Sequence, residues 1–387
     1  MVTYPEDWKE VQIGDIYQIK RGQVLATNKI SSIKNNTNKY PVYSSQTLNN
    51  GLLGYYHKFL FTNGITWTTD GANAGTTKYR EGQFYCTNVC GVLSSQEGYA
   101  NACMAEIINK ETPKYVSYVG NPKLMSNVVS KISVILPSLQ EQQAIASALS
   151  DFDEHIDNLS ELIEKKKAIR DGALEDLVSG RTRLDGFNGE WIESTIEDST
   201  KEIITGGTPS TTVDKYWGGS IPWLASTEIH QKIITRATKN ITNIGLNNSS
   251  AKMAPKDSVL IALAGQGKTR GTAAFLAYPM ALNQSLAALV AADETDSKFL
   301  YYLIENMYLE LRELSSGDGG RGGLNKTLIK NINIRLPREI KEQHAIAEVL
   351  TSLDDEIESL KIEKEKMLQI KEGEMDELLT GRVRLKA

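Results

Sequence analysis

The sequence predicts an α+β protein in which two mixed, β-rich globular domains are separated by two long antiparallel coiled-coil helices with pseudo-two-fold symmetry. Three observations predict this fold class. A stretch of 44 residues occurs twice, both copies have the apolar spacing of a long helix, and each follows short apolar runs broken by turn residues. The 387 residues are enough for two domains. We therefore expect globular domains at 1–137 and 185–337, and helical spacers at 138–184 and 338–387.

Many short strands are expected in the first domain. Runs such as "YPVYSS", "GITWTT" and "QFYCTNVCGVL" are rich in β-branched and aromatic residues, and Gly, Asn and Asp separate them. Trp8 opens this domain in "EDWKEVQIGDI", and Trp191 opens the second domain in "GEWIESTIEDS". These similar openings place both domains within one tandem duplication.

The repeated segment is expected to form a helix of about 39 residues, from Glu141 to Ser179 and again one repeat later. Residues 141–184 align without a gap on residues 342–385, and 18 of the 44 positions are identical. Ser138 and Glu141 form a possible capping box, and Gly180 lies where a glycine ends a helix. Apolar residues step by four and three in both copies, namely Ile145, Leu149, Phe152, Ile156, Leu159 and Ile163, then Ile346, Leu350, Leu353, Ile357, Leu360 and Met367.

Such a helix cannot bury its apolar seam alone. Its simplest partner is its own duplicate in the antiparallel direction, and the alternative is that each helix packs on its own domain. Gly172 and Gly373 occupy matching places inside the two helices, which suggests a close contact or a bend there. The four arginines that follow the helices (Arg181, Arg183, Arg382 and Arg384) either complement the helix C-termini or dock a partner.

The second domain repeats the β-rich pattern with different residues. "SIPWLAS", "DSVLIALAG", "GTAAFLAY" and "NINIRLP" read as strands, and "DSKFLYYLIENMYLELREL" reads as a helix between them. Both domains are expected to lead directly into their long helices.

Composition and charge bound the function. A net charge of −5 with 40% hydrophobic residues is typical of a soluble globular protein. The opening "MVTYPEDWKE" lacks the pattern of a secretory signal, and the longest apolar runs are too short for a bilayer. The cysteines Cys86, Cys90 and Cys103 form no C-x-x-C pair, and the histidines are isolated. We therefore expect a cytoplasmic protein without a membrane segment or a metal site.

Enzyme motifs are incomplete. "ALAGQGKT" ends like a phosphate-binding loop, but Ala262 stands where the first glycine is required and a strand is expected to follow. No Pro-Pro dipeptide supports an amino-methyltransferase pocket, and no Pro-Asp supports a nuclease. These patterns predict a protein that is not an enzyme and depends on partners for chemistry. A coiled-coil scaffold or interaction protein without DNA recognition is the alternative.

The chain resembles the specificity subunit of type I restriction–modification systems. The resemblance lies in "LPSLQEQQAIASALSDFDEHI", "LPREIKEQHAIAEVLTSLDDEI", the closing "SGRTRL" and "TGRVRL", and the domain openings "GGTPSTTVDKYWGGSIPWLASTEI" and "YPVYSSQTLNNGLLGYY". It implies two target-recognition domains, each reading one half of a split double-stranded DNA target, and helices that set the spacer length. It also implies docking of modification (methyltransferase) subunits, two of them on a pseudo-two-fold reader, and recruitment of restriction subunits. The methyl donor, ATP and magnesium are then expected on those partner subunits only, and no cofactor on this chain.

Candidate DNA-binding residues lie in polar loops of both domains. Base readout needs side chains with paired donors and acceptors. Gly-rich turns at 68–79 and 262–275 each precede a strand entered through an asparagine, and the resemblance adds polar loops near the start of each domain. The candidates are Ser44, Ser45, Gln46, Asp70, Asn73, Thr76, Lys78 and Asn88 in the first domain, and Thr208, Ser210, Gln266, Lys268, Thr269, Arg270, Asn283, Arg321 and Lys326 in the second.

These loops also have ordinary structural interpretations. Asn and Asp in hairpin turns often only cap backbone groups. The segment "SSGDGGRGGLNKT" is either an arm that orders on DNA through Arg321 and Lys326 or a flexible connection. The base sequence of the target and the spacer length do not follow from such patterns.

Overall fold

The structure, a computed structural model, describes residues 4–45, 48–315 and 323–385. It divides into two compact units, the first formed by residues 1–160 and 362–387 and the second by residues 161–361. We call the parts outside the two long helices the first head and the second head. This division cuts through the helices, so the predicted domain limits at 137, 184 and 337 stay predictions.

The first head is a curved sheet with one helix packed against it. Its six strands have the order β2 (Gln18–Arg21), β7 (Cys90–Ser94), β5 (Phe61–Thr68), β6 (Thr77–Cys86), β3 (Tyr40–Tyr43) and β4 (Leu52–Tyr56). Only the β3–β6 pair is parallel. A separate ribbon pairs β1 (Lys9–Gln12) with β8 (Ser133–Leu136). The helices are α1 (Ile13–Ile16), α2 (Ala102–Glu111) and α3 (Ser126–Val129).

Helix α2 begins at a clear cap and buries one face. The Asn101 side chain accepts a hydrogen bond from the backbone N–H of Met104, which satisfies one of the free donors of the first turn. Met104 and Ile108 are fully buried and pack in one cluster with Trp67 of the sheet. The main core of the head therefore lies between α2 and β5, and Phe84, Cys86, Cys90 and Val92 form a smaller separate cluster.

The second head contains two sheets. The first has the order β10 (Thr200–Thr205), β18 (Leu286–Ala291), β15 (Ser258–Ala262), β16 (Ala273–Leu276) and β12 (Ile233–Ile234). The other has the order β13 (Lys239–Ile241), β11 (Trp217–Leu224), β17 (Met280–Leu282) and β14 (Lys252–Ala254). β9 (Trp191–Thr195) pairs with β19 (Asn333–Pro337). The helices are α5 (Asn243–Asn247), α6 (Ser297–Asn306), α7 (Tyr308–Leu314) and α8 (Lys326–Lys330).

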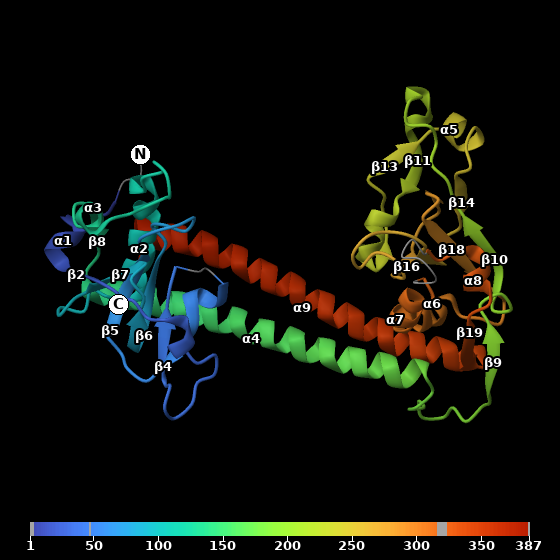
Figure 1. Cartoon of the computed structure of the whole chain (residues 1–387), viewed down its shortest axis with the longest axis horizontal. Coiled ribbons are helices and arrows are strands. Elements are labelled where there is room, and N and C mark those ends of the chain that lie inside the picture. Colours follow the sequence, from blue (N-terminus) through green and yellow to red (C-terminus); the bar gives the residue numbers. More distant parts are fainter. Residues whose placement is uncertain (1–3, 46–47, 316–322, 386–387) are drawn as a thin grey trace. The chain divides into compact units, whose positions relative to one another are not determined.

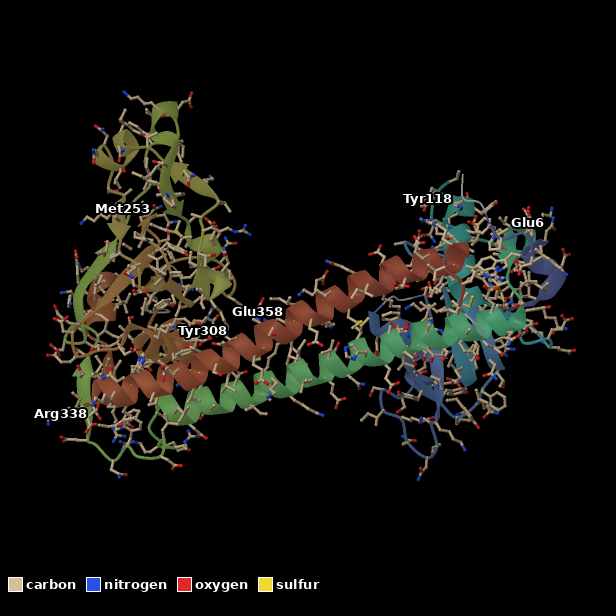
Figure 2. The ribbon with its side chains drawn as sticks, turned by 180° about the vertical axis from the view of Figure 1, so that it is seen from behind. Glu6, Tyr118, Met253, Tyr308, Arg338 and Glu358 are labelled. Atoms are coloured by element: carbon tan, nitrogen blue, oxygen red, sulfur yellow. The ribbon has the colours of Figure 1, made fainter. Side chains whose placement is uncertain are left out.

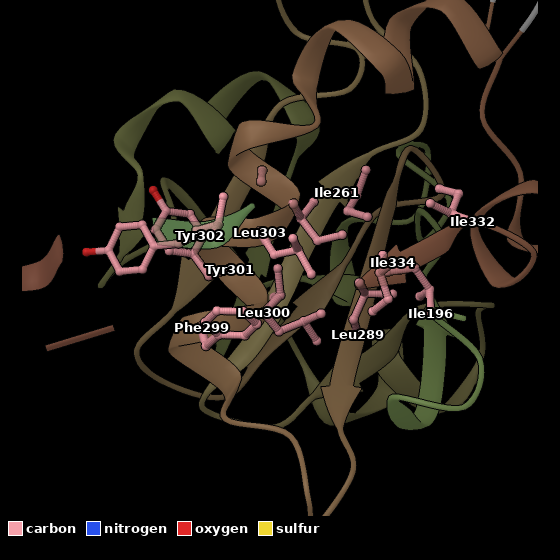
Figure 3. Packing of buried hydrophobic residues seen from close by; sticks show 14 of the residues in the cluster. Ile196, Ile261, Leu289, Phe299, Leu300, Tyr301, Tyr302, Leu303, Ile332 and Ile334 are labelled. Carbon is pink, nitrogen blue, oxygen red and sulfur yellow. The ribbon is translucent and has the colours of Figure 1, made fainter. Parts of the chain in front are cut away.

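The main core of the second head lies between α6 and the first sheet (Figure 3). Phe299, Leu300 and Leu303 of α6 pack in the same buried cluster as Ile261 and Leu289 of the sheet. The Asp296 side chain caps α6 by accepting from the N–H of Phe299, as Asn101 does for α2. Burying such side chains stabilises the fold by about 1.5–3 kcal/mol each.

The two heads share one backbone frame despite their unlike sequences. The order β2-β7-β5-β6 in the first head matches β10-β18-β15-β16 in the second. Single hydrogen bonds also correspond, because Thr87 N–H donates to the Tyr43 carbonyl as Asn283 N–H donates to the Leu224 carbonyl. The duplication therefore includes the heads, whereas the sequence reveals it only in the helices and in the Trp8 and Trp191 openings.

The two long helices are α4 (Leu139–Val178) and α9 (Ile340–Thr380), and they lie antiparallel within each unit (Figure 1). In the first unit, Lys371 Nζ is 2.5 Å from Asp153 Oδ1. In the second unit, Arg170 Nε is 3.0 Å from Asp354 Oδ1. The partner's number falls along α9 as the number rises along α4, so the predicted antiparallel pairing is confirmed.

Each helix also completes a core with the end of the other helix. Ile145 and Leu149 of α4 share the core of the first head with Leu378 and Leu379 of α9. The second core combines residues of both helices in the same way: Ile346 and Leu350 of α9 with Leu174, Leu177 and Val178 of α4. The helices therefore pack on each other and on the heads. Of the other seam residues, Ile156, Leu159, Ile163 and Ile357 are buried, and Phe152, Leu353, Leu360 and Met367 are half-buried.

A clasp of three side chains joins the helix ends in each unit. In the second unit Arg183 donates to both carboxylate oxygens of Glu342 at 2.6 and 2.8 Å, and Trp191 Nε1 donates to the same carboxylate at 3.3 Å. Glu342 is only 1% exposed. In the first unit Arg384, Glu141 and Trp8 form the same set, and Asp7 adds a second carboxylate to Arg384.

The other two arginines, Arg181 and Arg382, do not join the two helices. Arg181 binds Glu175 and Asp176, and Arg382 binds Asp376 and Glu377, each on its own helix. All four arginines after the helices thus have intramolecular carboxylate partners.

Of the close contact or bend expected at the helix glycines, the close contact is wrong. A Cβ added at Gly172 or at Gly373 would meet no atom within 4 Å. Both positions have room for a side chain, so packing does not require glycine there. Among the described residues, no helix has the length and apolar composition needed to cross a bilayer.

Candidate nucleic-acid interface

Three loops of the first head meet at one edge of its sheet. They are the residues after β3, the turn 69–76 between β5 and β6, and the turn 87–89 between β6 and β7. Backbone hydrogen bonds fix them to one another, from Thr69 N–H to the Val89 carbonyl at 2.9 Å and from Thr87 N–H to the Tyr43 carbonyl at 3.0 Å. We call this set of loops the first polar edge.

Candidate side chains from all three loops come together at this edge. The Asn73 amide lies 3.5 Å from the Ser45 carbonyl, and the Thr87 hydroxyl donates to Ser44 Oγ at 3.0 Å. Asn88 is exposed in the turn that follows β6. The structure thus brings Ser44, Ser45, Asn73 and Asn88 into one polar surface, as donors and acceptors for base edges would need to be.

Arg21 at the end of β2 belongs to the same edge, although the sequence did not indicate it. Its guanidinium donates to Asp70 Oδ2 at 3.2 Å and to the Asn88 carbonyl at 2.9 Å. The pairing neutralises Asp70, which would otherwise repel phosphate. Opposite charges in strands far apart in the sequence give no local pattern, so this pair could not be found by reading one segment.

Arg80 is a buried cation that positions the loop after β3. Its guanidinium stacks on the Tyr43 ring at 3.8 Å and donates to the Asn50 carbonyl at 2.8 Å. Burial lowers the pKa of Arg80, while the neighbouring Tyr43 opposes that shift. The cation therefore fixes both ends of the loop that carries Ser44 and Ser45.

The other two candidates of the first head lie away from these contacts. Thr76 is half-buried at the foot of its turn, where its N–H donates to the Asn73 carbonyl. Lys78 lies exposed on β6, and its charge acts on Glu106 of α2. Burial raises the pKa of Glu106, while Lys371 and Lys78 lower it. Thr77 and Tyr79 on either side of Lys78 face α2, so Lys78 itself extends from the opposite face of β6.

The second head has a corresponding polar edge, made of the loops 206–210, 263–272 and 283–285. Leu263 N–H donates to the Ser285 carbonyl at 2.8 Å, the counterpart of the Thr69–Val89 bond. The Thr208 hydroxyl donates to Gln284 Oε1 at 2.6 Å, which joins the first loop to the third. We call this set of loops the second polar edge.

The turn 263–272 carries most candidates of the second head. Gln266 and Lys268 are exposed, and Thr269 and Arg270 are half-buried. Helix α7 holds the turn in place, because Tyr308 donates to the Lys268 carbonyl at 3.2 Å and Arg312 donates to the Gly267 carbonyl at 2.6 Å. These bonds fix the backbone and leave the two exposed side chains projecting from it.

The two asparagines paired from the sequence are not equivalent. The backbone hydrogen bonds match Asn283 with Thr87, and Asn88 with Gln284. Asn283 is only 8% exposed, and its Oδ1 accepts from the backbone N–H of Ser285. Asn283 therefore caps a turn. The exposed amide of this loop is Gln284, which the sequence pattern did not indicate.

The remaining candidates are peripheral or not described. Ser210 is exposed and bonds to Thr212 at 2.9 Å. Lys326 is exposed in the first turn of α8, which Asn325 caps. Gln46 and Arg321 lie outside the described residues.

Strand β16 follows the sequence Gly267-Lys268-Thr269, whereas the phosphate-binding loop of P-loop nucleoside triphosphatases leads into a helix. Within residues 4–45, 48–315 and 323–385, no three His, Cys, Asp or Glu side chains are grouped as metal ligands would be. The polar edges present hydrogen-bond donors and acceptors on loops that backbone and side-chain hydrogen bonds join.

Comparison with protein families gives two matches along this chain. The model described as "Type I restriction modification DNA specificity domain" matches residues 5–167 and again residues 188–369. Each match thus contains one head and most of the helix that follows it.

Individual relatives cover most of the chain. A putative type I specificity subunit of Mycoplasma pneumoniae is 28% identical over 346 residues, which are 88% of this chain and 88% of the relative. The specificity subunit of the type I restriction enzyme MjaVIII from Methanocaldococcus jannaschii is 24% identical over 432 residues, covering 99% and 94% of the two chains.

Solved structures share the fold. The type I restriction–modification S subunit of M. genitalium superposes with a TM-score of 0.66 at 18% identity, over 100% of this chain and 99% of that one. A chain from a study of the assembly of a type I restriction–modification system gives a TM-score of 0.59 at 15% identity, over 98% and 100%.

Proposed function

The chain belongs to the type I restriction–modification DNA specificity family, and we propose that each head reads one half of a bipartite double-stranded DNA target. The observation that carries this proposal is the pair of polar edges. They occupy corresponding places on one shared backbone frame, yet their side chains differ. A common frame with unlike polar side chains suits two readers of unlike half-sites.

The exposed amides are the best candidates for base readout. Asn88 and Gln284 occupy equivalent positions, and Asn or Gln can bond adenine in a bidentate manner in the major groove. Lys268 and Gln266 extend the second edge, and Lys268 suits either a guanine or a phosphate. Arg21 is held by Asp70, so it supports the first edge by positioning its neighbours.

Helices α4 and α9 set the spacing of the two half-sites in this proposal. Matched insertions of seven residues in both helices keep the apolar seam in register. Such an insertion lengthens a helix by about 10 Å, or roughly three base pairs of duplex. We expect the preferred spacer to widen while both half-sites keep their sequence.

The chain itself is proposed to be non-catalytic and free of cofactors. It works with methyltransferase and restriction subunits on DNA, as its family does. Two modification subunits would dock on its helices, and the methyl donor, ATP and magnesium would bind to the partner subunits. The complex would act on DNA in the cytoplasm.

Mapping of methylated bases tests the proposal directly. The chain is expressed with its modification subunits in a methylation-free host, and the methylated motif is read from the genome. We expect a bipartite motif. Gln284→Ala with Lys268→Ala should relax one half only, and Asn88→Ala should relax the other half only. The proposal would be contradicted by a motif that lacks two halves. It would also be contradicted if substitutions in one head changed both halves of the motif.

A further inference from the structure

A hairpin of the first head presents two bulky apolar side chains to solvent. Ser117 and Lys123 close it with two reciprocal backbone hydrogen bonds, each of 2.9 Å. Gly120 adopts a φ of +76°, which lets the chain reverse within the loop. Tyr118 and Val119 form the tip and are 70% and 92% exposed. Tyr118 is labelled in Figure 2.

This hairpin is fixed to the first polar edge. Gly71 N–H donates to the Pro122 carbonyl at 2.9 Å, and Leu124 N–H donates to the Thr69 carbonyl at 2.9 Å. Asp70 and Lys123 form an isolated β-bridge. The tip is therefore held next to the turn that carries the candidate readers, because the arm 122–124 is bonded to that turn and the other arm is bonded to Lys123.

A single exposed apolar residue needs no explanation, but two adjacent ones on a braced tip are a different case. Covering such side chains is favourable in proportion to the apolar area removed from water. The neighbouring groups indicate what covers them, since they are polar side chains suited to base edges and the exposed cation of Lys123. DNA offers this combination, because its grooves contain thymine methyl groups and base faces between two rows of phosphates.

Resting on the proposed function of the first head, we propose that Tyr118 and Val119 form an apolar wedge that packs against bases of its half-site. The wedge adds contact with bases and leaves the phosphates to the basic residues around it. In the second head, the bond from Leu324 N–H to the Leu263 carbonyl corresponds to the Leu124–Thr69 bond. The sequence from Ser315 to Leu324 contains no aromatic residue, so the wedge acts on one half-site only.

The experiment measures DNA binding by the complex of this chain with its modification subunits. The probe is a fluorescent duplex that carries the bipartite motif found by methylation mapping. The test variant is Tyr118→Ser with Val119→Ser. Its control is Ile33→Ser, which removes an apolar side chain of the same head that is 71% exposed and precedes β3, whereas the polar edge follows β3.

The wedge predicts a loss of affinity of about tenfold in the double variant, within the range seen when base-stacking side chains are removed. The dependence of affinity on salt should keep its slope, because no phosphate contact is lost. The Ile33 variant should bind as the unaltered chain does.

Two results overturn the wedge. One is an affinity of the double variant within twofold of the unaltered chain. The other is loss of the modification subunits from the double variant in size-exclusion chromatography, which would assign the tip to a protein partner. If the unaltered complex itself shows no bipartite motif, the proposed function fails first, so the two failures are distinguishable.

Discussion

Glu342 is a buried carboxylate that Arg183 neutralises, and replacing it with Gln measures how much the clasp stabilises the second unit. Glu342→Gln keeps the shape of the side chain and an acceptor for Trp191, but it removes the charge that faces the guanidinium. Loss of one partner from a fully buried ion pair costs about 3–5 kcal/mol. The Arg183 side chain is 30% exposed, so water compensates part of this cost and we expect about 2–3 kcal/mol.

A loss of that size is readily measured. For a unit of this size it corresponds to a fall in melting temperature of about 5–10 °C. The assay is thermal and urea unfolding of the whole chain, followed by circular dichroism at neutral pH.

The matched control is Glu358→Gln on the same helix. Glu358 is labelled in Figure 2, its side chain is 63% exposed, and it pairs with Lys361 at 3.2 Å. Such surface pairs contribute about 0–1 kcal/mol, so the control should unfold almost as the unaltered chain does. If Glu342→Gln loses no more stability than Glu358→Gln, the clasp does not hold the helix ends as we infer.

Further predictions concern glycines and one titrating group. Gly91→Ala should destabilise the first unit by about 3 kcal/mol, because the added Cβ would lie 2.0 Å from the Trp67 ring; thermal unfolding checks this, and an unchanged midpoint would contradict it. Gly172→Ala and Gly373→Ala should each raise the free energy of unfolding by up to about 1 kcal/mol, and a loss in either would reveal a contact that the structure lacks. Burial raises the pKa of Glu106 above its value in the unfolded chain, so the stability from its protonated form is present at acid pH and is lost as pH rises through the folded pKa. Glu106→Gln should therefore be more stable than the unaltered chain at neutral pH and equal to it at acid pH, and a parallel pH profile for the two would refute the shift.

The helices were the most predictable part of this molecule. The expected helix from Glu141 to Ser179 agrees within two residues with the observed Leu139–Val178. Apolar spacing, caps and terminal glycines are local signals, and the helix obeys them because they act within a few residues. Of the contact or bend expected at Gly172, the contact was wrong, because a contact depends on other segments of the chain, which local signals do not report.

The heads were predictable as β-rich domains, but their shared backbone frame was not. Cys86 and Leu282 occupy equivalent places, and so do Cys90 and Leu286, because backbone hydrogen bonds define the frame and tolerate different side chains. The candidate readers lie in polar loops that local turn signals mark, and their role in DNA binding stays a prediction. Their individual roles depended on long-range partners, as the burial of Asn283 illustrates.

The clasps could not be foreseen either. Arg183 and Glu342 are 159 positions apart, and no sequence pattern in either segment identifies the other residue as its partner. The repeat alone suggested that the helices pair, whereas the carboxylate that each closing arginine binds became visible only in the folded chain.

The order in which the ribosome makes this chain sets different folding schedules for its two cores. Residues 161–361 are consecutive, so the second core has all its parts as soon as α9 begins to emerge. The first core is completed only when Leu378 and Leu379 are made, although most of its own strands end by Ser94, 284 residues earlier. A frameshift or stop codon late in the gene would therefore leave the earliest-made hydrophobic surface uncovered, and would damage the half of the protein farthest from the lesion in the sequence.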